Sequence, residues 1–268
     1  MKRLEGHVCV VTGGGAGLGR GIAMRIASEG AAVAIADIDL IAGETVAEEI
    51  RNAGGEATAY KCDVTKEEDV KTLVKKAKEK YGKIDLLCNN TGISLEARNI
   101  IRIEDLTEEQ WDLMFNVGLK SIFFTCKHII PEMIEAGGGS IVNVASVAAT
   151  HPTFGAAYGA VKAGVVGITK ALAVQYADDN IRCNCVSPGA MITPGGASAA
   201  NSGVFKDASE HRTRLINRFG TPEDVGAAVA FLLSDDAAYI TAANLSVDGG
   251  CLSIVSKIPP REKNRSGM

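Results

Sequence analysis

Tyr158 and Lys162 stand four residues apart in a segment with helical spacing (155–175), so their side chains share one helix face. A phenol with a pKa near 10 is a poor base at neutral pH. The positive charges of a nearby ammonium group and of an oxidised nicotinamide ring would stabilise the phenolate and so allow proton transfer. Ser146, twelve residues before the tyrosine, could hydrogen-bond a substrate oxygen. These three residues therefore predict acid–base catalysis on an alcohol or a carbonyl group.

A glycine-rich segment, Thr12-Gly-Gly-Gly-Ala-Gly-Leu-Gly19, joins the first apolar run to the first helical segment. A pyrophosphate sits on the exposed N–H groups of a helix N-terminus, and only residues without side chains let the backbone come that close. The spacing Gly13-x-x-x-Gly17-x-Gly19 differs from the more common Gly-x-Gly-x-x-Gly turn. We expect Gly13, Gly17, Leu18 and Gly19 to bind the phosphates of a dinucleotide.

Asp37 ends the second apolar run, 18 residues after Gly19. A carboxylate in that place accepts hydrogen bonds from the adenosine ribose and repels a 2′-phosphate. No Arg or Lys lies between Gly13 and Leu18, and Ile38 follows the acid. The sequence therefore favours NAD over NADP as the cofactor.

Two more segments follow strand-like runs and are expected at the same edge of the sheet. Asp63, with Val64 beside it, could meet the adenine edge of the cofactor. Asn89-Asn90-Thr91-Gly92 could line a ribose through Asn90 and Gly92, or could be a structural turn.

The elements that must position these residues are short apolar runs alternating with amphipathic helical segments. Most runs are continuously apolar, as expected for strands covered on both faces. The runs are Val8–Val11, Ala32–Ala36, Ala57–Cys62, Leu86–Cys88, Ser140–Val144, Arg182–Val186 and Asn244–Val247. Helix starts are indicated by capping boxes at Thr65–Glu68 and Thr107–Gln110 and by Thr221-Pro222. The alternation predicts an α/β fold, a doubly wound parallel sheet of about seven strands with helices on both faces.

We expect one domain over residues 1–250, without a linker or an internal repeat. The long stretch from Met191 to about Asp207 is rich in Gly, Ala and Ser, which is typical of a lid or binding loop. It belongs to an expected substrate loop over residues 190–217. Residues 251–268 are expected to form a partly flexible C-terminal extension.

The composition excludes several classes of protein. The chain has 268 residues, of which 46% are apolar, too many for a disordered chain. Its 28 basic and 32 acidic residues leave a net charge of −4, which argues against a nucleic-acid binder. No apolar run approaches the roughly eighteen residues of a membrane span, and the N-terminus lacks the pattern of a signal peptide. We therefore expect a cytoplasmic protein that binds neither nucleic acid nor membrane.

The seven cysteines have no paired spacing, and no Cys-x-x-Cys or neighbouring histidine gives a zinc pattern. Cys183 and Cys185 stand two apart in a strand-like run, so both point to one face and cannot easily bond to each other. We expect free buried thiols in a reducing compartment and no metal site.

These motifs together resemble the classical short-chain dehydrogenase/reductase family over residues 4–250. The matching motifs are Thr12–Gly19, Asn89–Gly92, Ser146, Tyr158–Lys162, Pro188-Gly189 with Thr193, and Val247-Asp-Gly-Gly250. The resemblance implies a Rossmann-type fold, hydride transfer to or from nicotinamide C4, and a homotetramer. It implies Tyr158 as acid/base, Ser146 as the binder of the substrate oxygen and Lys162 as the residue that holds the nicotinamide ribose and tunes the tyrosine. It also places Pro188 and Gly189 at the cofactor, with Thr193 and the backbone of Ile192 at its carboxamide.

The sequence departs from the family pattern at Gly118, which aligns with an asparagine that completes a proton relay from the lysine through water. Asn116 lies about 200° round an α-helix from that position and cannot easily substitute. Gly118 could leave room for an extra water, preserve a slower relay, or reflect lost activity. A tenfold faster Gly118→Asn variant would indicate a crippled relay, and an unchanged rate would indicate that water completes it. Thr91, in place of an alanine, is a mild departure.

The side chains expected to face a substrate flank the chemistry: Ser94, Leu95, Glu96, Ala148, Ala149, His151, Thr153, Met191 and the loop through Phe205. They fit a medium-sized secondary alcohol or ketone, with oxidation by NAD favoured. The alternative is an NAD-binding sensor or scaffold with little turnover, which only Gly118 supports. A nucleotide-sugar epimerase or dehydratase is disfavoured, because the chain lacks Gly-x-x-Gly-x-x-Gly and a longer substrate domain.

Overall fold

The structure is a computed structural model that describes residues 2–92, 102–151, 155–192 and 214–253. Its strands are β1 (Val8–Thr12), β2 (Ala32–Asp37), β3 (Glu56–Lys61), β4 (Leu86–Asn89), β5 (Gly139–Val144), β6 (Ile181–Pro188) and β7 (Asn244–Val247). Its α-helices are α1 (Gly17–Ser28), α2 (Leu40–Asn52), α3 (Glu67–Tyr81), α4 (Glu108–Phe115), α5 (Ser121–Glu135), α6 (Ala156–Gln175) and α8 (Pro222–Leu233). A π-helical segment, η2 (Asn116–Lys120), joins α4 to α5. Short 3₁₀ turns are η1 (Ile103–Asp105), η3 (Val147–Ala149), η4 (Ala177–Asp179), η6 (Asp235–Ala237) and η7 (Cys251–Ser253).

The seven strands form one sheet in the order β3-β2-β1-β4-β5-β6-β7, and every neighbouring pair is parallel. This confirms the predicted doubly wound α/β fold. The strand order reverses between β1 and β4, so the topology predicts that the loops after these two strands diverge and form a ligand crevice at the carboxyl edge. Ligands of open α/β sheets bind at such a switch point, which is where the glycine-rich segment lies.

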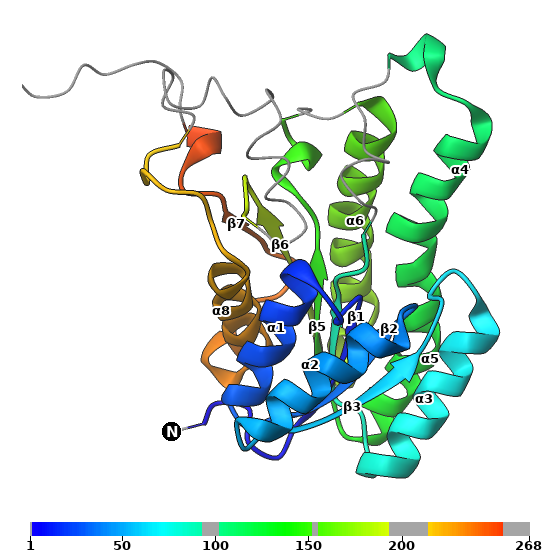
Figure 1. Cartoon of the computed structure of the whole chain (residues 1–268), viewed down its shortest axis with the longest axis vertical. Coiled ribbons are helices and arrows are strands. Elements are labelled where there is room, and N and C mark those ends of the chain that lie inside the picture. The colour runs from blue at the N-terminus through cyan, green and yellow to red at the C-terminus, as the bar shows by residue number, and fades with distance from the viewer. Residues whose placement is uncertain (1, 93–101, 152–154, 193–213, 254–268) are drawn as a thin grey trace, which may run out of the picture.

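The sheet is covered on both faces by helices, with α1, α2 and α8 on one side and α3, α5 and α6 on the other (Figure 1). Successive residues of a strand point to opposite faces, so Val10 packs under the second layer and Val11 under the first. Both faces are apolar, which is why the strands are continuously hydrophobic in sequence. Cys183 and Cys185 share one of these cores, as their spacing predicts.

Two of the three predicted helix starts are confirmed. Thr107 and Gln110 form the capping box of α4, and Pro222 occupies the first turn of α8. The capping box predicted at Thr65 is wrong, because α3 begins at Glu67 and the Thr65 hydroxyl instead donates to Asp63, 2.7 Å away. Thr65 therefore closes a local turn before the helix and does not cap it.

Two helical stretches, Glu108–Glu135 and Ala156–Gln175, are long and apolar enough to cross a membrane by length and composition. In each stretch, about half of the most apolar 18-residue segment is buried within the protein. A core helix of a globular protein passes the same test, so this is weak evidence for a membrane span. Both stretches include helices that pack on the sheet, and their apolar residues are used there.

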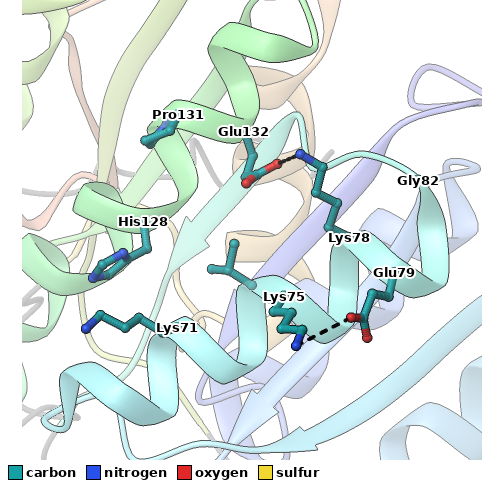
Figure 2. A pocket seen from close by; sticks show the side chains of 9 residues that line it. Lys71, Lys75, Lys78, Glu79, Gly82, His128, Pro131 and Glu132 are labelled. Atoms are coloured by element: carbon teal, nitrogen blue, oxygen red, sulfur yellow. Dashed lines mark ion pairs between the residues drawn. The ribbon is translucent and has the colours of Figure 1, made fainter.

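An exposed groove lies between α3 and α5, lined by residues of these helices and the glycine that ends α3 (Figure 2). Its charged side chains pair with one another: the ammonium of Lys78 lies 2.5 Å from Glu132 and that of Lys75 lies 3.9 Å from Glu79. No residue with a predicted role in cofactor binding or catalysis lines this groove. It is therefore a solvated helix–helix surface, separate from the carboxyl edge of the sheet.

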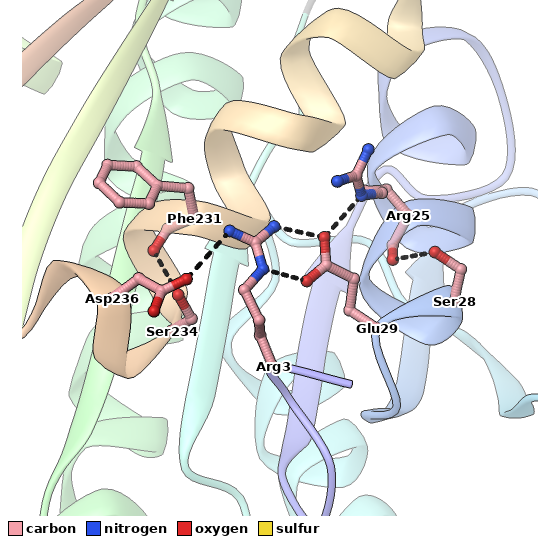
Figure 3. Close-up of polar contacts among 7 residues, drawn as sticks. All are labelled: Arg3, Arg25, Ser28, Glu29, Phe231, Ser234 and Asp236. Atoms are coloured by element: carbon pink, nitrogen blue, oxygen red, sulfur yellow. Dashed lines mark hydrogen bonds and ion pairs between the residues drawn. The ribbon is translucent and has the colours of Figure 1, made fainter. Parts of the chain in front are cut away.

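The N-terminal segment is held against α1 and α8 by a cluster of charges (Figure 3). The Arg3 guanidinium donates two hydrogen bonds to the Glu29 carboxylate, and Arg25 donates to the same carboxylate over 2.7 Å. Arg3 also reaches Asp236, 3.4 Å away, just after α8. These pairs lower the pKa of the Glu29 carboxyl, chiefly through the Arg3 hydrogen bonds. The cluster ties distant parts of the chain together at the amino ends of the strands, opposite the crevice.

Candidate active site

The glycine-rich loop turns tightly between β1 and α1. Gly13 and Gly17 have positive φ angles of 61° and 53°, which L side chains rarely adopt. A Cβ on Gly19 would lie 1.9 Å from the Gly13 carbonyl oxygen, so any side chain there would displace the loop. Within the described residues no side chain caps the start of α1, and its first turn holds no acid. The N–H groups and positive dipole end of α1 are thus suited to an anion.

Asp37 lies directly beside this loop, at the end of β2. One carboxylate oxygen accepts a hydrogen bond from the Gly15 N–H, 2.8 Å away, and the other accepts one from the Asp39 N–H at 3.0 Å. A Cβ on Gly15 would come within 2.8 Å of the same carboxylate. Asp37 therefore supports the glycine loop and keeps a negative charge next to it.

Asn90 clamps the glycine loop to β4. Its side-chain amide donates to the carbonyls of Thr12 and Gly13, at 3.1 and 3.0 Å. The Thr12 hydroxyl in turn accepts from the N–H groups of Asn90 and Thr91. Of the two roles left open by the sequence, these contacts establish the structural one, and the ribose contact of Asn90 and Gly92 stays a prediction.

Thr91 carries the orphaned polar atom of this region. Among the described residues, its buried hydroxyl oxygen has no hydrogen-bond partner. A Cβ on Gly13 would lie 3.2 Å from that oxygen, so the hydroxyl adjoins the glycine loop. Buried polar groups are normally hydrogen-bonded. An unsatisfied hydroxyl beside an uncapped helix start fits a crevice that a polar cofactor completes.

Asp63 and Val64 follow β3. The Asp63 carboxylate accepts hydrogen bonds from the N–H and the hydroxyl of Thr65, and Lys66 lies 3.4 Å away. Burial opposes ionisation of Asp63, but these contacts outweigh it and lower the pKa of the carboxyl. The Val64 side chain is buried in the core, so only its backbone could meet an adenine. Their contact with the cofactor stays a prediction.

The turn after β6 carries Pro188 and Gly189. The Gly189 N–H donates to the Val247 carbonyl at the end of β7, and a Cβ on Gly189 would lie 2.8 Å from the Asp248 Cα. The Ile192 N–H donates to the Gly220 carbonyl, 2.8 Å away. A backbone contact of Ile192 with a carboxamide would therefore have to use its carbonyl.

Ser146 follows the end of β5, and Lys162 of α6 contacts the last residue of the same strand. Ser146 precedes the turn η3, and its hydroxyl oxygen accepts from the Ala148 N–H at 3.1 Å. That leaves the hydroxyl proton available for donation. The Lys162 ammonium, 5% exposed, donates to the Val144 carbonyl, 2.8 Å away. This hydrogen bond fixes the buried lysine to Val144, which lies two residues before the serine.

Tyr158, the third of these residues, lies in the first turn of α6. It is 7% exposed, and the Lys162 ammonium lies 5.8 Å from the centre of its ring. An apolar cluster of Met114, Ala148, Ala157 and Val161 surrounds it. The tyrosine, lysine and serine are therefore brought together at the carboxyl edge, as the sequence predicts.

A buried chain of hydrogen bonds crosses the molecule behind these residues, and the sequence analysis missed it. Thr125 of α5 donates to Asn89 (2.7 Å), Asn89 donates to Asn143 (2.8 Å), and Asn143 donates to Thr169 of α6 (2.9 Å). All four side chains are buried. The chain fixes β4 and β5 relative to α6. The available signal was Asn143 inside one apolar strand run and Asn89 directly after another.

Of the three alternatives for Gly118, the structure argues against extra room for a water at the Cβ position. A Cβ on Gly118 would lie 2.4 Å from Cγ1 of Val161, so the valine fills that volume. The segment around Gly118 is also π-helical, so the angle estimated for an α-helix does not apply to Asn116.

Several expected substrate contacts lie outside the described residues: Ser94, Leu95, Glu96, Thr153 and the loop through Phe205. The expected carboxamide contact Thr193 and residues 254–268 of the expected C-terminal extension also lie outside them. Of those described, His151 is exposed, Ala149 and Met191 are half-buried, and Ala148 is 2% exposed. Ala148 therefore has little surface to offer a substrate and instead packs around Tyr158.

Comparison with known proteins agrees with this architecture. A family model described as Enoyl-(Acyl carrier protein) reductase matches residues 13–251. The fold and the matching sequence define a nicotinamide-type oxidoreductase class, and the chain belongs to the short-chain dehydrogenase/reductase family.

Several relatives share 38% identity with this chain, and two of them are named here. One is cyclohexanol dehydrogenase of Acinetobacter sp. (strain SE19), aligned over 94% of this chain and 97% of its own. The other is 3-oxoacyl-[acyl-carrier-protein] reductase of Thermotoga maritima, aligned over 92% and 98%. A solved structure of 7α-hydroxysteroid dehydrogenase with NADH and 7-oxo glycochenodeoxycholic acid is 32% identical, with a TM-score of 0.86 over 92% of this chain and 95% of that one.

Proposed function

We propose that this oxidoreductase interconverts a secondary alcohol and a ketone with NAD as its cofactor. The observation that carries the proposal is the buried Lys162, bonded to the Val144 carbonyl two residues before Ser146 and lying close to the Tyr158 ring. Burying an ammonium group costs free energy unless the group is hydrogen-bonded or paired with an opposite charge. Buried, hydrogen-bonded groups that can carry charge, placed at the ligand-binding edge of an α/β sheet, are candidates for an active site.

Each side chain has a chemical role in the proposed alcohol oxidation. Ser146 donates its hydroxyl proton in a hydrogen bond to the substrate oxygen and holds it in place. Tyr158 takes the proton that leaves this oxygen as the carbonyl forms. The positive charge of Lys162 stabilises the negative charge that the tyrosine carries. NAD, when bound, supplies the acceptor for the hydride from the substrate carbon.

The residues proposed to hold the cofactor surround the crevice. The N–H groups of Gly17, Leu18 and Gly19 at the start of α1 would receive the pyrophosphate. Asp37 would accept hydrogen bonds from the adenosine ribose, and its charge would repel the 2′-phosphate of NADP. The NADH in the hydroxysteroid dehydrogenase structure supports a nicotinamide cofactor for this chain.

A cyclic secondary alcohol is the first substrate class to test. The named relatives act on a cyclohexanol or a 3-oxoacyl group, and the solved neighbour holds a 7-oxo steroid. All three compounds carry the reacting oxygen on a secondary carbon. The panel should therefore contain cyclohexanols, hydroxysteroids, 3-hydroxyacyl thioesters, sugars and polyols, together with the matching ketones and NADH.

The test follows NADH absorbance in this panel with the wild type and with Tyr158→Phe as the blank. Turnover that falls by about 10²–10⁴ in the blank supports the proposal. Turnover that persists in Tyr158→Phe contradicts the role of the tyrosine. A panel that stays silent while NAD binds would favour the sensor or scaffold function.

We further propose that the enzyme is a homotetramer in a reducing, cytoplasmic compartment. Exposed apolar side chains on the α4–α5 helices and on α6, Leu113, Phe123, Ile134 and Val174, are between 44% and 78% exposed and suit a contact between copies. Six of the seven cysteines are buried as free thiols, and burial raises the pKa of Cys62 and Cys126 to about 12. Light scattering that gives the monomer mass would contradict the tetramer.

A further inference from the structure

The π-helical segment η2 and helix α6 approach each other closely at Gly118 and Val161. Among the described residues, the added Cβ on Gly118 would meet the Val161 side chain, at 2.4 Å from Cγ1 and 3.7 Å from Cβ. Real Cβ atoms essentially never lie within 3.0 Å of a non-bonded heavy atom of another residue. Both residues are buried, with Val161 2% exposed. The Val161 side chain therefore occupies the space that a side chain at position 118 would need.

A reciprocal contact lies one helical turn further along α6. A Cβ on Gly164 would come within 2.9 Å of the Leu119 side chain. Thus a glycine of η2 receives a valine of α6, and a glycine of α6 receives a leucine of η2. Two such interlocking contacts fix both the distance and the register of the two segments.

This interlock stands directly behind the candidate catalytic residues. Val161 precedes Lys162 in the chain and shares the apolar cluster with Tyr158, Ala148 and Met114. Neither the glycine nor the valine carries a polar group. The wall against which Tyr158 and Lys162 are held is therefore apolar at this point, and it supports them by packing.

We propose that Gly118 and Val161 are a mutually dependent pair of positioning residues, which orient Lys162 toward Tyr158 and tolerate a side chain at position 118 only when position 161 is shortened. The proposal rests on the proposed function, because the positioning concerns the proton transfer of Tyr158. It predicts an outcome for Gly118→Asn that differs from the two left open by the sequence, a faster or an unchanged rate. In this chain that substitution alone lowers the rate, since the asparagine meets Val161.

The test is a double-mutant cycle of Gly118→Ala and Val161→Ala. The matched control is Gly167→Ala, on the same helix, where an added Cβ meets no atom of the described residues within 4 Å. Because Gly167 shares a helix face with Val174, the oligomeric state of this variant is compared with that of the wild type. Because alanine favours helices over glycine, Gly167→Ala should keep or raise the melting temperature. Gly118→Ala should lower it by about 4 °C or more, and adding Val161→Ala should recover at least half of that loss.

This thermal cycle requires no turnover, so it remains decisive if the proposed enzyme activity fails. Additive effects of the two substitutions, or a Gly118→Ala variant as stable as Gly167→Ala, would overturn the pairing. The pairing and the proposed function are thereby tested separately.

The positioning role has its own readout, the pH profile of kcat. Val161→Ala loosens the support of Lys162, so the ammonium stabilises the phenolate less well. In Val161→Ala the pH at the midpoint of the rising limb should then increase by about half a pH unit, and in Gly167→Ala it should stay unchanged. NAD affinity should stay within about threefold in both variants. If the midpoint of the pH profile is unchanged in Val161→Ala, Gly118 and Val161 contribute only to packing, and their positioning role is overturned.

Discussion

The ammonium of Lys162 donates a hydrogen bond to the carbonyl oxygen of Val144, 2.8 Å away, and so joins helix α6 to the end of strand β5. Tyr158 lies one turn before the lysine, and Ser146 lies two residues beyond the valine. This one contact therefore sets the distance between the element that carries the proposed base and the element that carries the binder of the substrate oxygen.

Lys162→Met is expected to lower kcat by about 10²–10⁴, because the charge beside Tyr158 and the link to β5 are both lost. Lys162→Arg should not restore it, since a planar guanidinium cannot replace a compact ammonium in this buried place. The matched control is Lys170→Met on the exposed side of the same helix. Steady-state rates at saturating NAD provide the measurement. A Lys162→Met enzyme within about threefold of the wild type would contradict the assignment.

Asp37→Asn should lower the preference for NAD over NADP, measured as the ratio of kcat/KM values, by about tenfold or more. The amide keeps an acceptor for the Gly15 N–H but loses the charge that repels a 2′-phosphate. Asp37→Ala loses that acceptor too, so it should weaken both cofactors. Asp39→Asn serves as control, since Asp39 caps α2 with bonds to Ile41 and Ala42. A wild type that binds NADP as tightly as NAD would disprove the argument.

Gly19→Ala should abolish tight NAD binding, because its Cβ would meet the Gly13 carbonyl oxygen at 1.9 Å and the Asn90 amide at 2.6 Å. We expect at least about a hundredfold weaker binding in a fluorescence titration. Gly167→Ala introduces the same methyl group into open space and should stabilise α6 by about 0.5–1 kcal/mol. Equal NAD affinity in both variants would show that the close approach at Gly19 does not govern binding.

His7 should stabilise the fold at mildly acid pH through Asp85, whose carboxylate accepts from the imidazole at 2.9 Å and from Lys83 at 2.6 Å. The hydrogen bond to Asp85 raises the pKa of His7, against the opposing effect of burial. Burial opposes ionisation of Asp85, but its hydrogen bonds from His7, Lys83 and the Val8 N–H lower the pKa of the carboxyl.

The raised pKa of His7 means that its contribution is complete below about pH 6.5 and is lost as the pH rises through the folded-state value. The lowered pKa of Asp85 means that its contribution is present above about pH 3.9 and is lost as the pH falls through the folded-state value. Urea unfolding should therefore show His7→Gln destabilised by about 0.5–1 kcal/mol at pH 6, after solvent screening, and by less at pH 9. Arg51→Met, which breaks the Arg51–Glu44 pair on α2, is the control, with a loss that is equal at both pH values. A His7→Gln loss independent of pH would contradict the charged pair.

Features encoded by local pattern were predictable. The strand runs and helix segments follow from hydrophobic periodicity, and each of the seven observed strands lies within two residues of its prediction at either end. Tyr158 and Lys162 share a helix face by their spacing alone. The glycine loop was recognisable because glycine is needed wherever the backbone bends sharply at a strand–helix junction.

Features decided by competition between partners were not predictable. The Thr65 hydroxyl could cap α3 or bond Asp63, and the geometry of the turn after β3 decides for Asp63. Asn90 could face a cofactor or hold the glycine loop, and the nearness of β1 to β4 places the Thr12 and Gly13 carbonyls within its reach. Both choices depend on residues far along the chain.

By itself, the sequence determined the order of elements, the glycine loop and the types of side chain at the carboxyl edge, because these depend on residues close together in the chain. Only the tertiary structure decided that Val161 fills the space beside Gly118, that Lys162 bonds Val144, and that a buried asparagine pair links β4 to β5. The physical reason is packing. Whether a volume is empty or filled depends on fractions of an ångström between segments that meet only when the chain is folded.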